Sequence, residues 1–278
     1  MDRRKIRWRI GFYICLAAVL LYGGSHSITA MIGNAATQKN ITAKKAVENI
    51  YALSFELSSN PFGRINTYVP YDEEVGQNIA ETYAGYFGLS HLVEESEEHF
   101  LFADDNRRLY VSKQINQLRY EQSESSKEKH SQEKLSGDRA ALRHVDAFIE
   151  NHLLTLNYEE AIVTFDGESY GIQLVHTLGN LKNFGYPERL RLDSYGNVLS
   201  MDYSYRSYRP LDNTKIKSEK EAFYELPLIE GFNTQIFIHS CRLVYHVQNA
   251  ILQPAYLFEG ETNLGEHFEA FVDAVALH

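Results

Sequence analysis

The pattern of apolar and polar positions changes sharply along the chain, and its first change is the most informative. A continuous apolar run extends from Ile10 to Tyr22, follows five basic side chains within residues 1–9, and is followed by no charged side chain until Lys39. An uncharged helix satisfies its own backbone groups in a membrane, and basic residues before it stay cytoplasmic. We therefore expect a cytoplasmic basic tail at 1–9, a transmembrane anchor or signal at 10–32, and a body outside the cytoplasm.

Anchor and cleaved signal both remain open from the sequence. The strictly apolar run has 13 residues, nearer to a signal-peptide core than to the ~20 residues of a spanning helix. Trp8 and Tyr22 flank the run as interfacial aromatics do, and residues 23–32 are uncharged, so a helix could continue through them. We favour the retained anchor, which makes this a single-pass protein of the cell membrane with an extracytoplasmic C-terminal domain.

Helical periodicity recurs four times beyond residue 40. Thr42 can cap a helix over 43–57, Asp72 can cap a second over 73–89, and a third amphipathic pattern covers 139–154. Ser218 and Glu221 form a capping-box pattern ahead of a short helix that reaches Leu226. Each helical pattern beyond Asp72 precedes a group of strand-like segments.

Alternating β-rich runs supply the strands. Asp166-Gly167 and residues 195–197 are turn signals, and Pro254 should begin its strand or lie at an edge because it cannot donate to a ladder. The predicted strands are 99–104, 107–114, 117–122, 159–165, 169–178, 188–194, 197–205, 235–247, 250–261 and 267–276.

One polar segment divides the body. Residues 121–138 are rich in Ser, Gln, Lys and Glu and contain little to bury, which is typical of a flexible linker. The segment beginning at Arg108 aligns without gaps to the one beginning at Arg189, which indicates a repeat. The predicted fold class is α+β: an N-terminal transmembrane helix, then two or three helix-plus-antiparallel-sheet modules, the first at 38–120 and the others within 139–278.

Charge and motifs narrow the function. Beyond residue 9 the chain holds 22 Lys and Arg against 36 Asp and Glu, a net charge of −14, which disfavours binding to nucleic acid. No metalloprotease, Walker-loop, dinucleotide or paired-cysteine signature is present. The sequence therefore predicts neither an enzyme nor a cofactor.

Two groups of side chains could bind something. A metal could use Glu266, His267 and Glu269 with His239 and His246, but neighbouring strand residues point to opposite faces, so we expect ordinary sheet-face polar residues and no metal site. Tyr203, Tyr205 and Arg206 combine aromatic and guanidinium groups as peptide-binding surfaces do. They are the candidate extracytoplasmic surface, and a half-buried edge strand is the plainer alternative.

Several segments resemble the extracytoplasmic YycI/YycH regulators of Gram-positive bacteria, whose repeats are akin to PepSY domains. The resemblance is carried by the basic-flanked apolar run and by KIKSEKEAFYEL, LVYHV, QPAYLFEGE and FEAFVDAV, which lie within residues 215–275. It implies an accessory protein whose membrane helix packs against a sensor histidine kinase that governs cell-wall homeostasis, with a paralogous regulator as a further partner.

Helix packing in membranes depends on small residues, which points to Gly11, Ala17, Ala18 and Gly23 as the partner-binding positions. The alternative hypothesis is an exported PepSY-like binding module or protease inhibitor that acts on a soluble or wall-associated partner. A retained anchor favours the regulator, and cleavage favours the exported binder.

Overall fold

The computed structural model describes residues 44, 47, 50–123, 133–154, 156, 158–204, 206–227 and 235–276. The chain divides into two compact units, Met1–Lys44 and Lys45–His278, and the elements below belong to the second. The predicted span at 10–32, with Gly11, Ala17, Ala18 and Gly23, lies outside the described residues. Within the described part, no helix is both long and apolar enough to cross a membrane.

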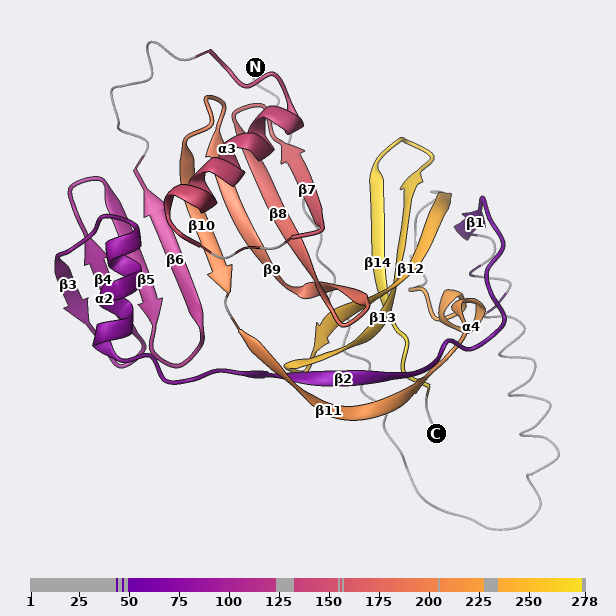
Figure 1. The fold of residues 1–278 in the computed structure, drawn as a ribbon. Coiled ribbons are helices and arrows are strands. Elements are labelled where there is room, and N and C mark those ends of the chain that lie inside the picture. The colour runs from indigo at the N-terminus through magenta and orange to yellow at the C-terminus, as the bar shows by residue number, and fades with distance from the viewer. Residues whose placement is uncertain are drawn as a thin grey trace, which may run out of the picture. The chain divides into compact units, whose positions relative to one another are not determined.

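The predicted fold class is wrong. The structure is mostly β-sheet, with 53% strand against 15% helix, and the described strands join into one 14-stranded mixed sheet rather than separate helix-plus-sheet modules (Figure 1). Strands that are far apart in sequence pair edge to edge, so backbone groups that modules would expose are satisfied by neighbouring segments.

Eight strands form an antiparallel part of this sheet, and two helices pack on it. Its strands lie in the order β3-β4-β5-β6-β10-β9-β8-β7, and the pairing of β6 with β10 joins its two halves. The elements are α2 (Gln77–Tyr86), β3 (Leu92–Glu95), β4 (His99–Ala103), β5 (Arg107–Ser112), β6 (Gln117–Gln122), α3 (Asp138–Asn151), β7 (Glu160–Phe165), β8 (Ser169–Leu178), β9 (Leu181–Asp193) and β10 (Val198–Ser204).

Both long helices of this part pack on one apolar core, to which α2 contributes Ala80 and Ala84 and α3 contributes Val145 and Ile149. Rings from both helix ends and the sheet stack at its centre. The ring centroids of Phe87 and Tyr120 lie 5.1 Å apart, and those of Phe148 and His152 lie 4.1 Å apart. The C-terminal ends of α2 and α3 therefore meet above β6.

The β6–β10 joint has an approximate two-fold symmetry. The sequence alignment that starts at Arg108 and Arg189 makes Tyr120 equivalent to Met201, and these two residues are also direct partners across the joint. A residue pair that is both equivalent and opposed lies on a two-fold axis. An axis perpendicular to the sheet keeps α2 and α3 on the same face, as observed.

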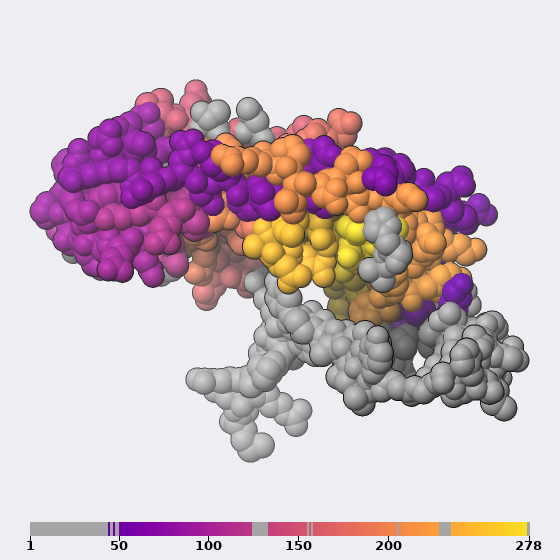
Figure 2. Space-filling model, turned by 90° about the horizontal axis from the view of Figure 1, so that it is seen from below, coloured from indigo at the N-terminus to yellow at the C-terminus, as the bar shows by residue number. Residues whose placement is uncertain are grey.

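The remaining elements form the mixed part of the sheet. In it, β1 pairs in parallel with β12, β13 pairs with both β12 and β14, and β2 and β11 form a long antiparallel ribbon. Figure 2 shows indigo and orange atoms of this ribbon running side by side. The elements are β1 (Tyr51–Leu53), β2 (Gly63–Tyr71), β11 (Ser207–Ile216), α4 (Glu219–Phe223), β12 (Ile236–Gln248), β13 (Ile251–Thr262) and β14 (His267–Asp273).

The helix predictions succeed where local signals are complete. The capping box of Ser218 and Glu221 begins α4, and the pattern over 139–154 forms α3, so both predictions are confirmed. The helix predicted over 43–57 is too long, because Tyr51–Leu53 is a strand that takes backbone partners on β12. In the predicted linker, 121–122 belong to β6 and 124–132 lie outside the described residues.

Asp72 does not cap α2, contrary to the prediction. The N-cap is Gly76, and the Asp72 carboxylate instead accepts a hydrogen bond from the Asn116 N–H at 3.1 Å. The helix therefore begins four residues later than a cap at Asp72 requires. Its buried residues are Ala80 and Ala84, and Ile79 and Tyr86 remain exposed.

Pro254 lies inside β13 rather than at its start or at a sheet edge, so that prediction is also wrong. Its carbonyl accepts from the Ala274 N–H at 3.1 Å, just beyond the end of β14. Within a strand, a residue's N–H and C=O point to the same side. An N–H at position 254 would therefore point to the end of β14, where the backbone pairing stops. The missing N–H of proline costs little pairing there.

Gly260 on β13 tests how tightly the mixed part is packed. An added Cβ there would collide with the Phe237 carbonyl oxygen and lie 2.9 Å from the Ile238 Cα, both of which are backbone atoms that cannot turn aside. We expect Gly260→Ala to lower the free energy of unfolding by about 3 kcal/mol in chemical denaturation. Gly265→Ala is the control: its site is open but has φ +75°, so the expected cost is about 1 kcal/mol. Equal losses would contradict the packing argument.

Candidate protein-contact site

A groove of about 300 Å³ opens where α2, the end of α3 and β10 meet. Four of its lining residues come from α2, two follow α3, and one comes from β10: Ile79, Thr82, Tyr83, Tyr86, Leu153, Leu154 and Tyr203. We call these residues the α2–α3 groove.

The walls of the α2–α3 groove expose large apolar side chains. The exposed fractions are 44% for Ile79, 36% for Tyr86 and 69% for Leu153. The rings of Tyr83 and Tyr86 meet edge to face with centroids 6.0 Å apart, which fixes their orientation. Single exposed apolar residues are ordinary, but a contiguous group that lines a depression is typical of a contact site.

Leu153 holds an unusual backbone conformation. It follows the C-cap residue His152 with φ +53°. The Leu153 N–H donates to the Glu150 carbonyl and the Leu154 N–H to the Ile149 carbonyl, each at 3.1 Å. This is a Schellman ending, whose left-handed position usually holds glycine.

The equivalent position after α2 does hold glycine. Gly88 has φ +66°, its N–H donates to the Gly85 carbonyl, and the Leu89 N–H donates to the Ala84 carbonyl. The two helices therefore end in the same motif with different residues. A leucine at this position costs backbone strain of about 1 kcal/mol, although most of its side chain is exposed.

A buried polar cluster lies beside Tyr203. The Asn183 side-chain oxygen accepts from the Gly185 N–H at 3.0 Å, so its amide nitrogen faces His176 Nε2 at 3.0 Å and the Tyr208 hydroxyl at 3.3 Å. His176 Nε2 must then accept, which leaves the proton on Nδ1. That nitrogen lies 3.5 Å from an oxygen of Glu188, a carboxylate only 2% exposed.

Three buried polar atoms within the described residues lack a hydrogen-bond partner: Glu188 Oε2, Ser204 Oγ and Arg206 Nε. They belong to the region where the chain passes from β10 to β11. Arg206 nevertheless lies over the Tyr186 ring at 4.7 Å and 3.4 Å from the Asp72 carboxylate. The contacts of Arg206 hold the connection between β10 and β11 in place, although three of the described buried polar atoms there lack a hydrogen bond.

The predicted surface of Tyr203, Tyr205 and Arg206 does not form as one exposed patch. Tyr203 is only 6% exposed and belongs to the core, where its ring lines the α2–α3 groove. Burial raises its pKa to about 12, with smaller contributions from Tyr83 and Glu188. Arg206 is largely buried against Tyr186. Tyr205 lies outside the described residues.

The residues weighed for a metal site stay apart. His239 pairs with Glu261 at 3.6 Å, His267 pairs with Glu269 at 3.8 Å, and His246 stacks on Phe271 with centroids 4.2 Å apart. Across the described part of the chain, no three His, Cys, Asp or Glu side chains form a group that could hold a metal ion.

The sequence also contains a catalytic pattern that the motif search above missed. Residues 167–171 read GESYG, which fits the G-x-S-x-G pattern of a nucleophile elbow. That elbow requires an exposed serine between a strand and a helix, whereas Ser169 begins β8 directly after a hairpin turn and is buried. Its hydroxyl donates to Asp166 at 3.0 Å and accepts from Arg191 Nε at 3.1 Å. The serine closes the turn.

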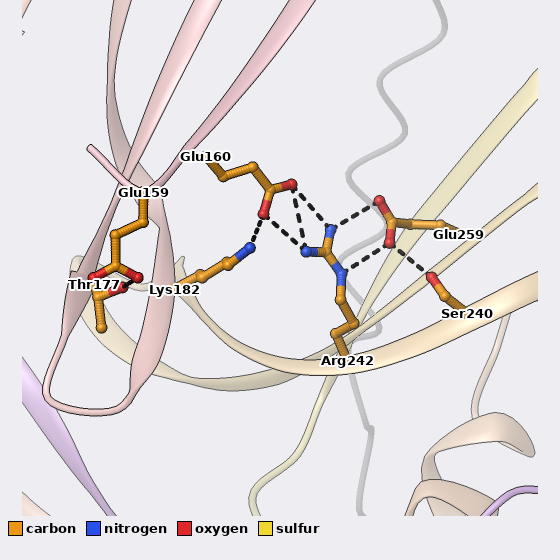
Figure 3. A network of polar contacts seen from close by, with 7 residues as sticks. All are labelled: Glu159, Glu160, Thr177, Lys182, Ser240, Arg242 and Glu259. Carbon is orange, nitrogen blue, oxygen red and sulfur yellow. Dashed lines mark hydrogen bonds and ion pairs between the residues drawn. The ribbon is translucent and has the colours of Figure 1, made fainter.

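Arg242 on β12 links the antiparallel and mixed parts of the sheet (Figure 3). It donates to both oxygens of Glu259 at 2.9 and 3.0 Å and to Glu160 on β7 at 3.0 Å. Lys182 pairs with the same Glu160, and the Ser240 hydroxyl donates to Glu259 at 2.8 Å. Four strands, β7, β9, β12 and β13, thus meet in one network of charge-assisted hydrogen bonds.

This network fixes the charge state of Glu160. Burial by itself would raise the pKa of its carboxyl, but the hydrogen bonds from Lys182 and Arg242 outweigh burial and lower the pKa. A carboxyl whose pKa is lowered on folding stabilises the fold above its unfolded pKa of about 4.3, and that stabilisation is lost as the pH falls through its folded pKa.

Comparisons with solved structures give distant likenesses, two of which are described here. Neither the known protein families nor the curated proteins include a match to this chain. The chain is similar to the Bacillus megaterium YpeB C-terminal domain, with a TM-score of 0.45 and 14% identity over 73% of this chain and 95% of that one. It is also similar to an uncharacterized protein from Eubacterium rectale ATCC 33656, with a TM-score of 0.48 and 9% identity over 85% and 96%. At these scores the likenesses carry no conclusion about function.

Acid titration tests the Arg242 network. We expect Glu160→Gln to lower the free energy of unfolding above about pH 5, with the difference from the unsubstituted chain narrowing as the pH falls below about 4.3. Urea denaturation at several pH values measures this difference. Glu97→Gln, on the exposed turn between β3 and β4, is the matched control and should show no such narrowing. A constant difference for Glu160→Gln would show that its charge does not stabilise the fold.

Proposed function

We propose that this chain is a membrane-tethered regulator that modulates a sensor histidine kinase of cell-wall homeostasis by protein contact, with its body outside the cytoplasm. The observation that carries the contact role is the α2–α3 groove, which exposes Ile79, Tyr86 and Leu153. A groove of this kind suits apolar side chains of a protein partner.

The place of action is supported by the sequence. Basic residues before the uncharged run at 10–32 favour an N-terminus in the cytoplasm and a body on the other side. The class of partner rests on the resemblance of several segments to the YycI/YycH regulators. In this proposal the small residues Gly11, Ala17, Ala18 and Gly23 let the membrane segment approach a helix of the kinase closely.

The membrane contact is tested by enlarging the small residues. We expect Ala17→Leu with Ala18→Leu to weaken regulation of the kinase about fivefold or more, because close helix packing contributes on the order of 1 kcal/mol. The measurement is kinase phosphorylation in cells, with protease resistance of the body as a check of folding. Leu20→Ile with Leu21→Ile keeps the run apolar and serves as the matched control.

A form secreted without residues 1–38 separates the proposal from its alternative. If the proposal is correct, this form loses most regulation. Full regulation by the secreted form, or release of the natural chain by cleavage, would instead favour an exported binding module or inhibitor that acts on a soluble or wall-associated partner.

A further inference from the structure

The α2–α3 groove has a chemistry that selects among partners. We propose that it binds an amphipathic helix of a partner protein that presents apolar side chains to the groove and lysine or arginine around them. This inference rests on the proposed function only in taking protein contact as the activity, and it adds to the membrane contact a second contact made by the body of the chain.

Charge around the groove argues for a cationic partner. The helix α2 contains no basic residue, and the last turn of α3 contains Glu150 and no basic residue. The C-terminal end of a helix also carries partial negative charge. Arg107, which donates to the Phe87 carbonyl at the end of α2, is itself paired with Asp104 at 2.6 Å.

The charge state of His152 preserves this negative character. Its Nδ1 lies 2.7 Å from the Phe148 carbonyl, and its ring packs on Phe87 and Phe148. Burial lowers the pKa of His152, so the ring stays neutral at neutral pH and adds no positive charge at the end of α3. The body as a whole carries a net charge of −14 beyond residue 9, which attracts cationic partners over longer distances.

Leu153 supplies the second, independent observation. Its left-handed backbone is strained for leucine, the equivalent position after α2 holds Gly88, and 69% of the leucine is exposed beside the groove. A strained residue that buries little in its own fold points to a use elsewhere. Helix-in-groove recognition provides that use, because the partner would cover the leucine and complete an apolar contact with Ile79 and Tyr86.

Two designed peptides test the inference against the full chain in nanodiscs of zwitterionic lipid. Each is a helix of roughly four turns with a leucine face; one has lysine on its polar face and the other has glutamate. Fluorescence anisotropy should detect binding of the lysine peptide only. We expect Leu153→Gly to weaken that binding about tenfold or more while raising Tm by about 2 °C, because glycine relieves the strain.

Leu264→Gly is the matched control, since Leu264 is 75% exposed on the β13–β14 turn, and it should leave peptide binding unchanged. Equal weakening by both variants, or equal binding of both peptides, would overturn the inference. So would self-association of the chain that depends on Leu153 in sedimentation, because a second copy would then be the occupant.

The outcome is separable from that of the proposed function. Loss of peptide binding in Leu153→Gly with kinase regulation intact supports the groove and leaves regulation to the membrane segment. Loss of regulation in the Ala17 and Ala18 variant, with peptide binding unchanged, supports the membrane contact alone.

Discussion

The pairing of β6 with β10 is the interaction on which the rest of the antiparallel part depends. Without it, β6 and β10 would each expose an unpaired strand edge. The joint removes both edges and places Tyr120 beside Met201 on an approximate two-fold axis. It also brings Phe87, at the end of α2, against His152, at the end of α3. The α2–α3 groove is a consequence of this joint, because its lining combines residues of α2, the two residues that follow the end of α3, and Tyr203 of β10.

A second constraint governs the junction between the antiparallel and mixed parts. Little backbone pairing crosses it within the described residues: β12 meets β9 at Tyr245 and Asn183. Side chains supply the rest, through a small apolar cluster that includes Val244 and through the Arg242 network. A guanidinium shared by two carboxylates fixes direction better than an apolar contact of similar size does. The orientation of β7 relative to β12 and β13 therefore depends on polar groups that respond to pH.

Local signals in the sequence predicted the strands and two of the helices well, and they failed wherever distant segments decide the outcome. The hairpin that includes Asp166-Gly167 and the capping box at Ser218 are encoded within a few residues. The β6–β10 joint depends on two edges that lie about 80 residues apart, and no periodicity records which edges will pair. For the same reason, Tyr203 reads as an exposed aromatic from alternation, although the helix ends above it bury it. The sequence could have suggested the groove through Ile79 and Tyr86, but it did not indicate that Leu153 and Leu154 would lie opposite them.

Leu153 shows how stability and function separate in this fold. A Schellman ending needs a left-handed residue, and the chain has met that need with glycine after α2 and with leucine after α3. The motif is satisfied in both cases, so the difference between the two helix ends does not arise from backbone hydrogen bonding. Glycine at position 153 would relieve the strain, and the leucine side chain that stands there instead buries little surface against the described residues. A residue that costs stability and contributes little packing is better explained by what it presents to a partner than by what it does for the fold. This reasoning places the proposed protein contact at the end of α3, where the apolar walls and the negative charge coincide.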